Sequence, residues 1–272
     1  MALSVLDVYK VLPQTNCGDC GYQTCLAFAT AVIKEGEDLE KCPHLSARGR
    51  ELGQTIKNQQ EAGIGRRRES VAIAAEALHD KVARLDFAAL APGLGADYGQ
   101  EAGRPYLIIP YFGQPLQVFK DEVRYPPGIS EDPWDAILLY NYIASQGDQP
   151  PTGEWVTFQD LPNSVSKAKT LKRLEEGLAA KISGQMERLQ PQAAALGAEP
   201  ASPGTTADVA FVFRPLPRVP ILLMFYEADA AEGFAAQAQL LFDAQISSYL
   251  DLESTLFLVE QLIARLTPKD DR

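Results

Sequence analysis

The chain has 272 residues, of which 46% are hydrophobic and 22% are charged, a globular composition that can bury a core and excludes disorder throughout. Its formal net charge is −11, which opposes contact with phosphate backbones and anionic lipid, so we expect neither nucleic acid nor a membrane surface among its partners. No apolar run approaches the roughly 18 residues of a membrane span and the first residues lack a secretory pattern, so the sequence predicts a soluble, cytoplasmic protein.

Residues 1–48 predict a small helical module. A short helix that Ser4 can cap ends before Pro13, because proline has no backbone N–H to continue it. A loop follows, and then an alanine-rich helical segment over residues 25–34. Residues 46–68 are polar and contain Gly63 and Gly65, so the domain boundary is predicted there, although part of this segment fits a helix.

Residues 49–103 are predicted to be a helical linker region. From residue 69 to residue 90, apolar side chains recur every three or four positions, which is typical of one face of a helix. Arg66, Arg67 and Arg68 precede this helix, and in an acidic chain we interpret them as a solvated turn instead of a nucleic-acid contact. Residues 92–103 are rich in glycine and predict a connector.

Residues 104–272 are predicted to form a larger domain. Two strands, residues 106–112 and 116–120, meet at Gly113 and Gln114, and two further strands cover residues 208–213 and 219–226. Helices are predicted over residues 132–145, 169–189 and 252–266. Because the strands come in pairs instead of alternating with helices, the predicted fold class is α+β, with an antiparallel or mixed sheet flanked by helices.

All cysteines of the chain lie within its first 42 residues, at Cys17, Cys20, Cys25 and Cys42. A disulfide framework would distribute its cysteines over the fold and would suit a secreted chain. The crowded spacing indicates one shared metal centre instead. Two alternatives fit: a zinc ion, which prefers two paired knuckles and accepts histidine, and a 4Fe-4S cluster, often held by three cysteines of one tight loop and a remote fourth.

The residues between the cysteines favour the cluster. Gly18 and Gly21 each follow a cysteine, and a glycine backbone can bring its N–H groups close to the sulfurs. Cys25 begins a predicted helix, whose N-terminus stabilises a thiolate. Pro43 follows the last cysteine, as in cluster-binding ferredoxin sequences.

The stretch from about residue 3 to residue 45 resembles a known iron–sulfur module. This module occurs in the large subunit of corrinoid iron–sulfur proteins and in the B subunit of Rnf-type electron-transport complexes. The resemblance implies that a 4Fe-4S cluster is bound by all four cysteines, and it is specific for the cofactor but not for a reaction. The motif reads Cys17-Gly18-Asp19-Cys20-Gly21-Tyr22-Gln23-Thr24-Cys25, followed by Cys42-Pro43.

Residues 104–272 resemble an uncharacterised domain family of unknown function, often fused behind this module in anaerobic bacteria and archaea. Because that family has no established activity, the resemblance implies an association with the cluster and no chemistry. It rests on Arg104-Pro105-Tyr106, Asp208-Val209-Ala210-Phe211, Arg214-Pro215-Leu216-Pro217, Pro220-Ile221-Leu222, Phe225-Tyr226-Glu227-Ala228-Asp229 and Leu241-Phe242-Asp243.

The histidines and several arginines are further candidates, each with a structural alternative. His44 could tune the cluster or gate a proton, and it could equally be a loop residue beside the site. His79 could be an axial ligand of a haem or corrinoid, against a structural role on its helix. With two histidines in the chain, a Ser–His–Asp hydrolase is disfavoured. Arg104, Arg214 and Arg218 could bind an anion or form surface salt bridges.

Carboxylates and aromatic rings of the larger domain complete the candidates. Glu227, Asp229 and Asp243 follow apolar segments and could do acid–base chemistry or bind a cation, although carboxylates at strand ends commonly serve as caps. An aromatic-rich segment could line a planar cofactor pocket or, by default, pack in the core. Its members are Tyr106, Tyr111, Tyr125, Trp134, Tyr140 and Tyr142.

The sequence therefore predicts a redox centre without visible substrate machinery. The leading hypothesis is a non-catalytic electron carrier that passes single electrons to a partner. The partner could be a redox protein, for example a corrinoid-dependent protein, or a cofactor such as a corrinoid or other tetrapyrrole. One alternative is a redox or oxygen sensor or assembly factor whose cluster controls partner binding. Another is a purely structural metal site.

Overall fold

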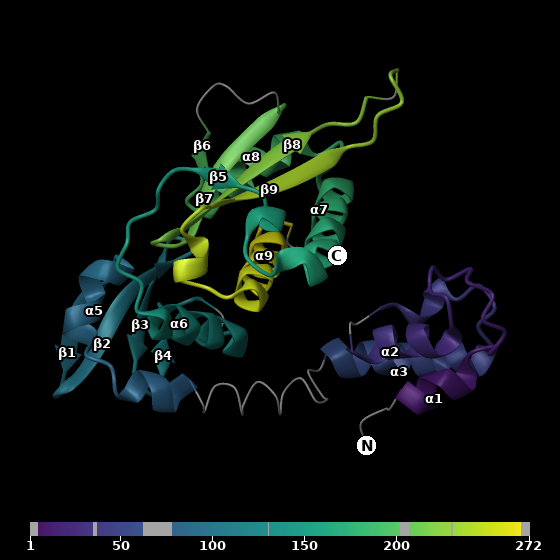
Figure 1. Cartoon of the computed structure of the whole chain (residues 1–272), viewed down its shortest axis with the longest axis horizontal. Coiled ribbons are helices and arrows are strands. Elements are labelled where there is room, and N and C mark those ends of the chain that lie inside the picture. Colours follow the sequence, from purple (N-terminus) through teal and green to yellow (C-terminus); the bar gives the residue numbers. More distant parts are fainter. Residues whose placement is uncertain are drawn as a thin grey trace. The chain divides into compact units, whose positions relative to one another are not determined.

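The computed structural model describes residues 5–34, 37–61, 78–129, 131–201, 207–229 and 231–267. The chain divides into two compact units, Met1–Ala74 and Ala75–Arg272. Figure 1 labels the elements of both units. Within the described ranges, no helix combines the length and apolar character needed to cross a bilayer.

The first unit is helical, as predicted. It contains α1 (Val5–Val11), α2 (Cys25–Lys34), a 3-10 turn η1 (Leu39–Lys41) and α3 (Ala47–Glu61). The polar segment at residues 46–68 is thus helical up to Glu61, and residues 62–68 lie outside the described residues. Apolar side chains of all four elements form one small core, in which two cysteines take part: Val8, Leu12, Cys25, Phe28, Ala29, Val32, Leu39, Cys42, Leu45 and Ile56.

The second unit contains two antiparallel sheets, which confirms the α+β class. The four-stranded sheet has the order β1 (Asp97–Glu101), β2 (Arg104–Tyr111), β3 (Gln114–Phe119) and β4 (Val123–Arg124). The five-stranded sheet has the order β5 (Trp155–Val156), β9 (Gln237–Asp243), β8 (Val219–Tyr226), β7 (Val209–Leu216) and β6 (Glu199–Pro200). Strand β8 lies in the middle and is buried along nearly its whole length, as expected for a strand covered on both faces.

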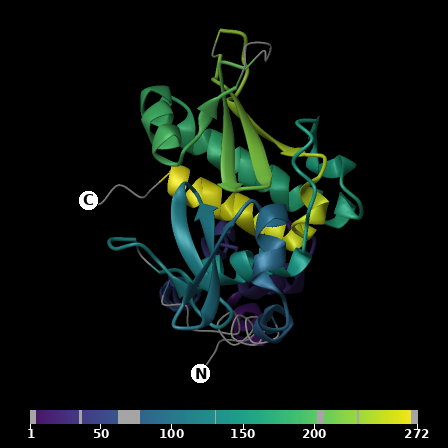
Figure 2. The same cartoon turned by 90° about the vertical axis from the view of Figure 1, so that its left-hand side faces the viewer.

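Helices cover and connect these sheets. They are α5 (Phe87–Leu94), α6 (Pro133–Ser145), α7 (Ala168–Ile182), α8 (Met186–Ala195) and α9 (Leu252–Leu266), with 3-10 turns η2 (Phe158–Asp160), η3 (Ser164–Ser166) and η4 (Ile246–Ser248). Helix α9 crosses the middle of the unit, with the five-stranded sheet on one side and the four-stranded sheet on the other (Figure 2). The predicted helices at residues 132–145 and 252–266 are confirmed, and Asp132 caps the first of them through the Trp134 N–H.

The predicted helix at residues 69–90 and the connector at residues 92–103 need correction. Residues 69–77 lie outside the described residues, and the described helix ends at Ala83. A new helix, α5, begins at Phe87, because the Asp86 carboxylate accepts the N–H groups of Ala88 and Ala89 at 3.0 and 3.4 Å. Residues 92–94 continue that helix and residues 97–101 form β1, so the glycine content of this segment marks the ends of elements and not a connector.

The predicted helix at residues 169–189 is two helices. Gly184, at φ +73°, separates α7 from α8, and the Glu227 carboxylate accepts hydrogen bonds there from Ser183 Oγ at 2.6 Å and the Gly184 N–H at 3.0 Å. Strand β9 was not predicted, because its first residues, Gln237 and Gln239, are polar and exposed and interrupt the apolar pattern.

Replacing Asp86 by alanine should destabilise the second unit by about 1 kcal/mol, the usual cost of losing a helix cap. The two helical N–H groups that it binds would lose their acceptor. Urea unfolding followed by tryptophan fluorescence measures this, since Trp134 and Trp155 both lie in the second unit. Asp86→Asn keeps an acceptor and should stay close to the parent; equal loss in both variants would contradict the capping role.

Candidate metal centre

The loop that carries Cys17 and Cys20 has a glycine-dependent backbone. Gly18 and Gly21 have φ values of +83° and +85°, a region that side chains disfavour. The Gly21 N–H donates to the Gly18 carbonyl at 2.8 Å and closes a tight turn around Cys20. The two glycines therefore let the chain reverse twice within five residues of Cys17, so that Cys17 and Cys20 belong to one compact turn.

Cys25 stands at the first position of α2, and two side chains cap that helix. Its backbone N–H donates to Asn16 Oδ1 at 2.8 Å, and the Ala27 N–H donates to Thr24 Oγ1 at 3.1 Å. The first bond fixes the residue before Cys17 against the start of α2.

Cys42 enters the site from the opposite part of the module. Asp38 caps the turn η1 by accepting the Glu40 N–H at 3.0 Å, and Cys42 ends that turn with its N–H on the Leu39 carbonyl. Leu39 is buried in the apolar core of the unit, so the turn that delivers Cys42 is held in place by packing.

The four thiols differ in exposure, and those of Cys17, Cys20 and Cys25 lie near enough to Cys42 to affect its pKa. Burial raises the pKa of the Cys42 thiol, and the neighbouring sulfurs of Cys20, Cys17 and Cys25 raise it further, while a hydrogen bond from the His44 backbone opposes them. Cys25 and Cys42 are buried, Cys20 is half-buried and Cys17 is exposed, and none forms a disulfide.

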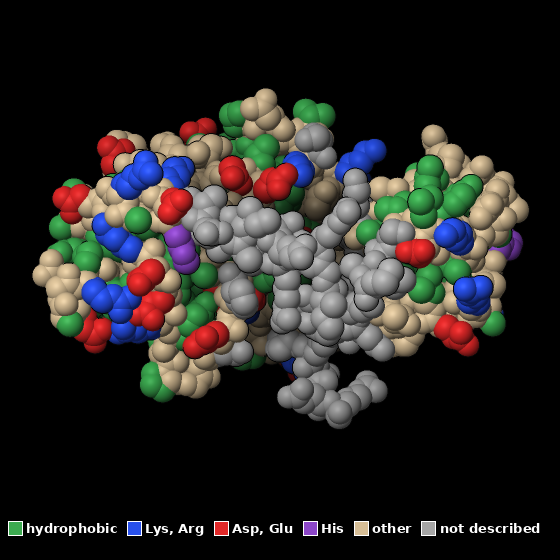
Figure 3. Space-filling view, turned by 90° about the horizontal axis from the view of Figure 1, so that it is seen from below, with side chains coloured by type: hydrophobic (Ala, Val, Ile, Leu, Met, Phe, Trp, Pro, Cys, Tyr) green, Lys and Arg blue, Asp and Glu red, His purple; other side chains and the backbone are tan. Residues whose placement is uncertain are grey.

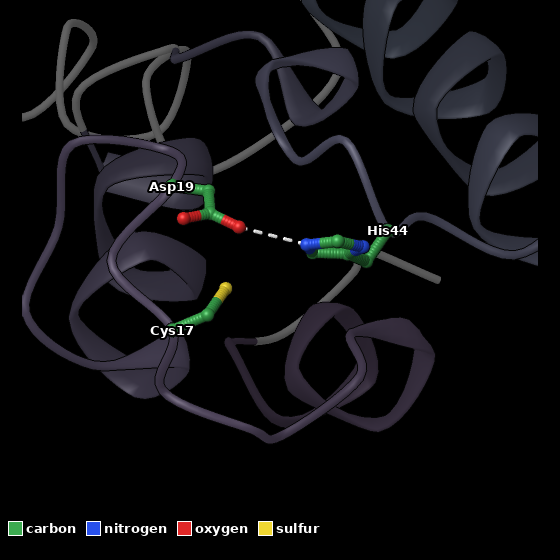
Figure 4. A group of neighbouring side chains, drawn as sticks. All are labelled: Cys17, Asp19 and His44. Carbon is green, nitrogen blue, oxygen red and sulfur yellow. Dashed lines mark hydrogen bonds and ion pairs between the residues drawn. The ribbon is translucent and has the colours of Figure 1, made fainter.

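His44 and Asp19 lie at the exposed corner beside Cys17. His44 Nε2 is 2.8 Å from Asp19 Oδ2, and the hydrogen bonds from the His44 ring and from the Cys17 thiol lower the pKa of Asp19. Donor atoms of the three residues lie within 4.8 Å of one another (Figure 4). The contact joins the loop of the first two cysteines to the segment after Cys42, which agrees with the position expected of His44 beside the site.

The donor set fits an iron–sulfur cluster better than a zinc ion. Four cysteines that could supply soft sulfur ligands are present, the backbone around the first two is bent by glycines, and two of the thiols lie among apolar side chains. The spacing gives one C-x2-C pair followed by two single cysteines, whereas structural zinc sites combine two such pairs.

The predicted carboxylates of the second unit do not form a joint site. Glu227 binds the α7–α8 junction, and Asp229 accepts the N–H groups of its own turn at Ala231 and Glu232. Asp243 is fully buried and accepts hydrogen bonds from the segment before β5 and from Gln245, at 2.6 to 3.2 Å. Since β8 and β9 are antiparallel, the ends that carry Glu227 and Asp243 point in opposite directions. Each carboxylate therefore has a structural role.

The predicted arginines are also separate from one another. Arg104 bridges Asp121 and Glu122 at 2.7 and 3.0 Å, and Arg214 pairs with the exposed Glu199 at 3.5 Å. Arg218 donates to the carbonyls of residues 92 and 93 at 3.1 Å. Figure 3 shows basic and acidic side chains interspersed on the visible face of the second unit. These contacts support the salt-bridge interpretation over an anion site.

His79 lines a surface cavity of about 350 Å³ in the second unit. Its ring meets the Tyr140 ring edge to face at a centroid distance of 4.6 Å. Both acidic and basic side chains line the cavity, and its two basic side chains already have partners. Arg104 pairs with Asp121 and Glu122, and Lys120 donates to the Ala83 carbonyl at 2.8 Å. The remaining lining residues are Asp80, Pro105, Phe119 and Asp121. These contacts give His79 a structural partner, as its alternative role on the helix predicts.

Three aromatic residues of the segment, Tyr111, Tyr140 and Tyr142, pack in the core, whereas Tyr106, Tyr125 and Trp134 are half-buried. Tyr111 takes part in a buried network that the sequence did not reveal. Tyr111 Oη donates to Asp135 Oδ1 at 2.7 Å, and Arg265 reaches both carboxylate oxygens of Asp135 at 3.0 and 2.9 Å. Burial raises the pKa of Asp135 and, more strongly, of Tyr111. The network ties β2 to α6 and α9. Tyr140 and Tyr142 bind backbone carbonyls of Phe119 and Leu94.

Asn16 and Asp19 are the site residues that sequence reasoning passed over. Asn16 adopts φ +52°, a conformation that asparagine tolerates better than most residues. An asparagine directly before a Cys-Gly pair was the available signal for a cap on the helix at Cys25.

Family models cover both units of the chain. The model described as "Putative Fe-S cluster" matches residues 12–44, and the model described as "Domain of unknown function (DUF3786)" matches residues 86–265. The first contains all four cysteines. No solved structure matches the chain.

Curated relatives are similar to the first unit. The acetyl-CoA decarbonylase/synthase complex subunit gamma of Methanocaldococcus jannaschii is 46% identical over 44 residues, 16% of this chain and 9% of that protein. The corresponding subunit of Methanothermobacter thermautotrophicus is 48% identical over 46 residues, 17% and 10% of the two chains. The corrinoid/iron-sulfur protein large subunit of Moorella thermoacetica is 47% identical over 51 residues, 19% and 11%. This chain thus covers about a tenth of the length of these relatives.

Proposed function

We propose that this chain, which belongs to the family defined by the domain of unknown function (DUF3786), binds one 4Fe-4S cluster and exchanges single electrons with a partner protein. The observation that supports the proposal is that Cys17, Cys20 and Cys25 lie near enough to Cys42 to raise the pKa of its thiol, inside the region matched by the iron–sulfur family model and with no disulfide among the four. A bound cluster would supply a one-electron carrier.

Each cysteine has a distinct part in this proposal. Cys25 and Cys42 would hold the cluster against the apolar core, where low polarity and few waters favour a low net charge on it. Cys20 would complete the buried side. Cys17 is exposed, so its sulfur lies on the side from which an electron can reach a partner. The backbone bent at Gly18 and Gly21 would direct N–H groups to the sulfurs and tune the potential.

The relatives support a redox role and not a particular reaction. They are a corrinoid/iron-sulfur protein large subunit and gamma subunits of acetyl-CoA decarbonylase/synthase complexes, but the similarity is confined to the iron–sulfur module. We therefore infer a redox partner protein, a corrinoid-dependent protein included, and place no corrinoid in this chain. The titratable groups described above in the second unit are engaged in structural contacts, so an electron carrier fits better than an enzyme.

Anaerobic purification followed by iron and acid-labile sulfide analysis tests the proposal. We expect about four iron and about four sulfide per chain, and an EPR signal after one-electron reduction. One equivalent of zinc with no sulfide would contradict the cluster. A full cluster that cannot be reduced and reoxidised with small mediators would leave it a structural site and contradict electron exchange.

A further inference from the structure

The segment of the chain that contains Cys17 has almost no charge. Between Lys10 and Lys34, Asp19 is the only charged residue, whereas 22% of all residues are charged. The carboxylate of Asp19 is hydrogen-bonded to the His44 ring at 2.8 Å, so it is not left without a partner on this surface. The exposed cysteine thus lies in a stretch of low charge within a chain of net charge −11.

The same surface offers apolar area. Leu26 is 49% exposed in the first turn of α2, directly after Cys25. The bond from the Cys25 N–H to Asn16 Oδ1 holds the loop next to that turn, so Leu26 and Cys17 border one surface. We name the exposed residues 14–18, 23, 24 and 26 the Cys17 face.

Glu37 and Asp38, two acidic residues shortly before Cys42, are engaged in local contacts. Glu37 and Asp38 are half-buried; Glu37 pairs with Lys41 at 2.6 Å and Asp38 caps the following turn. Cys42 itself is buried among apolar residues. The acidic stretch before Cys42 is therefore tied up in local contacts.

We propose that the Cys17 face is where a redox partner docks, through an uncharged and partly apolar contact surface on that partner. The inference rests on the proposed function, because it requires an electron to leave at the Cys17 side. When a partner buries Leu26 and the neutral loop, water is excluded and no unpaired charge loses its hydration. A charged face would have to lose that hydration, which would weaken binding. The chain's overall negative charge elsewhere would still disfavour wrongly oriented encounters with acidic partners.

A matched pair of electron acceptors tests the charge of this face. Riboflavin and FMN share one redox ring, and FMN adds a phosphate dianion. The reduced full chain would give one electron to either flavin, which becomes the semiquinone and takes its proton from solvent. We expect the two rates to agree within about twofold, at about 10 mM and about 500 mM salt alike. If electron transfer to FMN is about tenfold slower than to riboflavin at low salt, and the difference vanishes at high salt, the proposal is overturned.

Two variants localise the effect. Leu26→Glu should slow electron transfer to FMN relative to riboflavin by about threefold at low salt. Thr55→Glu, on the exposed side of α3, should leave the ratio of the two electron-transfer rates unchanged. Equal effects of both variants would show that electrons leave elsewhere. A dimer in sedimentation velocity that Leu26→Glu dissociates would mean that a second copy of this chain covers the face, and would overturn a redox partner as its occupant.

A second readout does not need the cluster. In the reduced, cluster-free full chain, Cys17 can be alkylated with neutral iodoacetamide or anionic iodoacetate and quantified by peptide mass spectrometry. The ratio of the two rates at Cys17 should change less than about twofold with salt; a rise of several-fold would overturn the neutral face. Missing iron in the purified protein would instead contradict the proposed function, and the alkylation result would still decide the charge of the face.

Discussion

Replacing Cys25 by serine is expected to remove the cluster and to lower the iron content per chain at least about tenfold. Loss of a residue that only supports a metal ligand already lowers metal affinity by about this factor, and loss of a ligand should lower it at least as much. Cys25 is buried in the apolar core at the N-terminus of α2, so neither water nor another side chain can take its place easily. A serine hydroxyl is a poor ligand for iron in a sulfur-rich cluster. Iron and sulfide analysis and the visible spectrum of the anaerobic protein measure the loss.

Two companion variants sharpen this result. Thr24→Ser keeps the hydroxyl that accepts the Ala27 N–H and should keep full iron, which controls for disturbance of the helix start. Cys17→Ser alters the exposed corner, which water can reach, so this variant should retain more iron than Cys25→Ser. Tryptophan fluorescence should be unchanged in all three, since both tryptophans lie in the second unit. Full iron in Cys25→Ser would exclude Cys25 as a ligand.

The site was predictable from sequence where its determinants are local. The four cysteines, the glycines that bend the loop and the helix starting at Cys25 all lie within a short stretch, and each signals its own conformation. Helices α6 and α9 were predictable for the same reason, since Asp132 and Asp251 cap them from the adjacent position.

The parts that sequence reasoning missed depend on partners far along the chain. The break between α7 and α8 is stabilised by Glu227, which lies 43 residues after Gly184. Asp135 and Arg265 are 130 residues apart, and the sequence around either residue does not predict their contact. Strand β9 pairs with β8 through backbone groups, so its polar first half carries no apolar signal.

Replacing Asp135 by alanine is expected to destabilise the second unit by about 3 kcal/mol, the lower part of the range for breaking a buried pair from one side. Arg265 would lose both of its hydrogen bonds to the carboxylate, and the buried Tyr111 hydroxyl would lose its acceptor. The lower part of the range applies because the Arg265 side chain is 28% exposed and water can partly replace its partner. Urea unfolding followed by circular dichroism gives the free energy of unfolding.

An exposed pair in the same unit provides the matched control for Asp135→Ala. Glu199→Ala removes the partner of Arg214, and since both side chains are largely exposed, the change should stay within about 0.5 kcal/mol. The double variant Asp135→Leu with Arg265→Met removes both buried charges and should recover part of the loss, because no unpaired charge remains. If Asp135→Ala and Glu199→Ala cost the same, the network at Asp135 does not stabilise the junction of β2, α6 and α9.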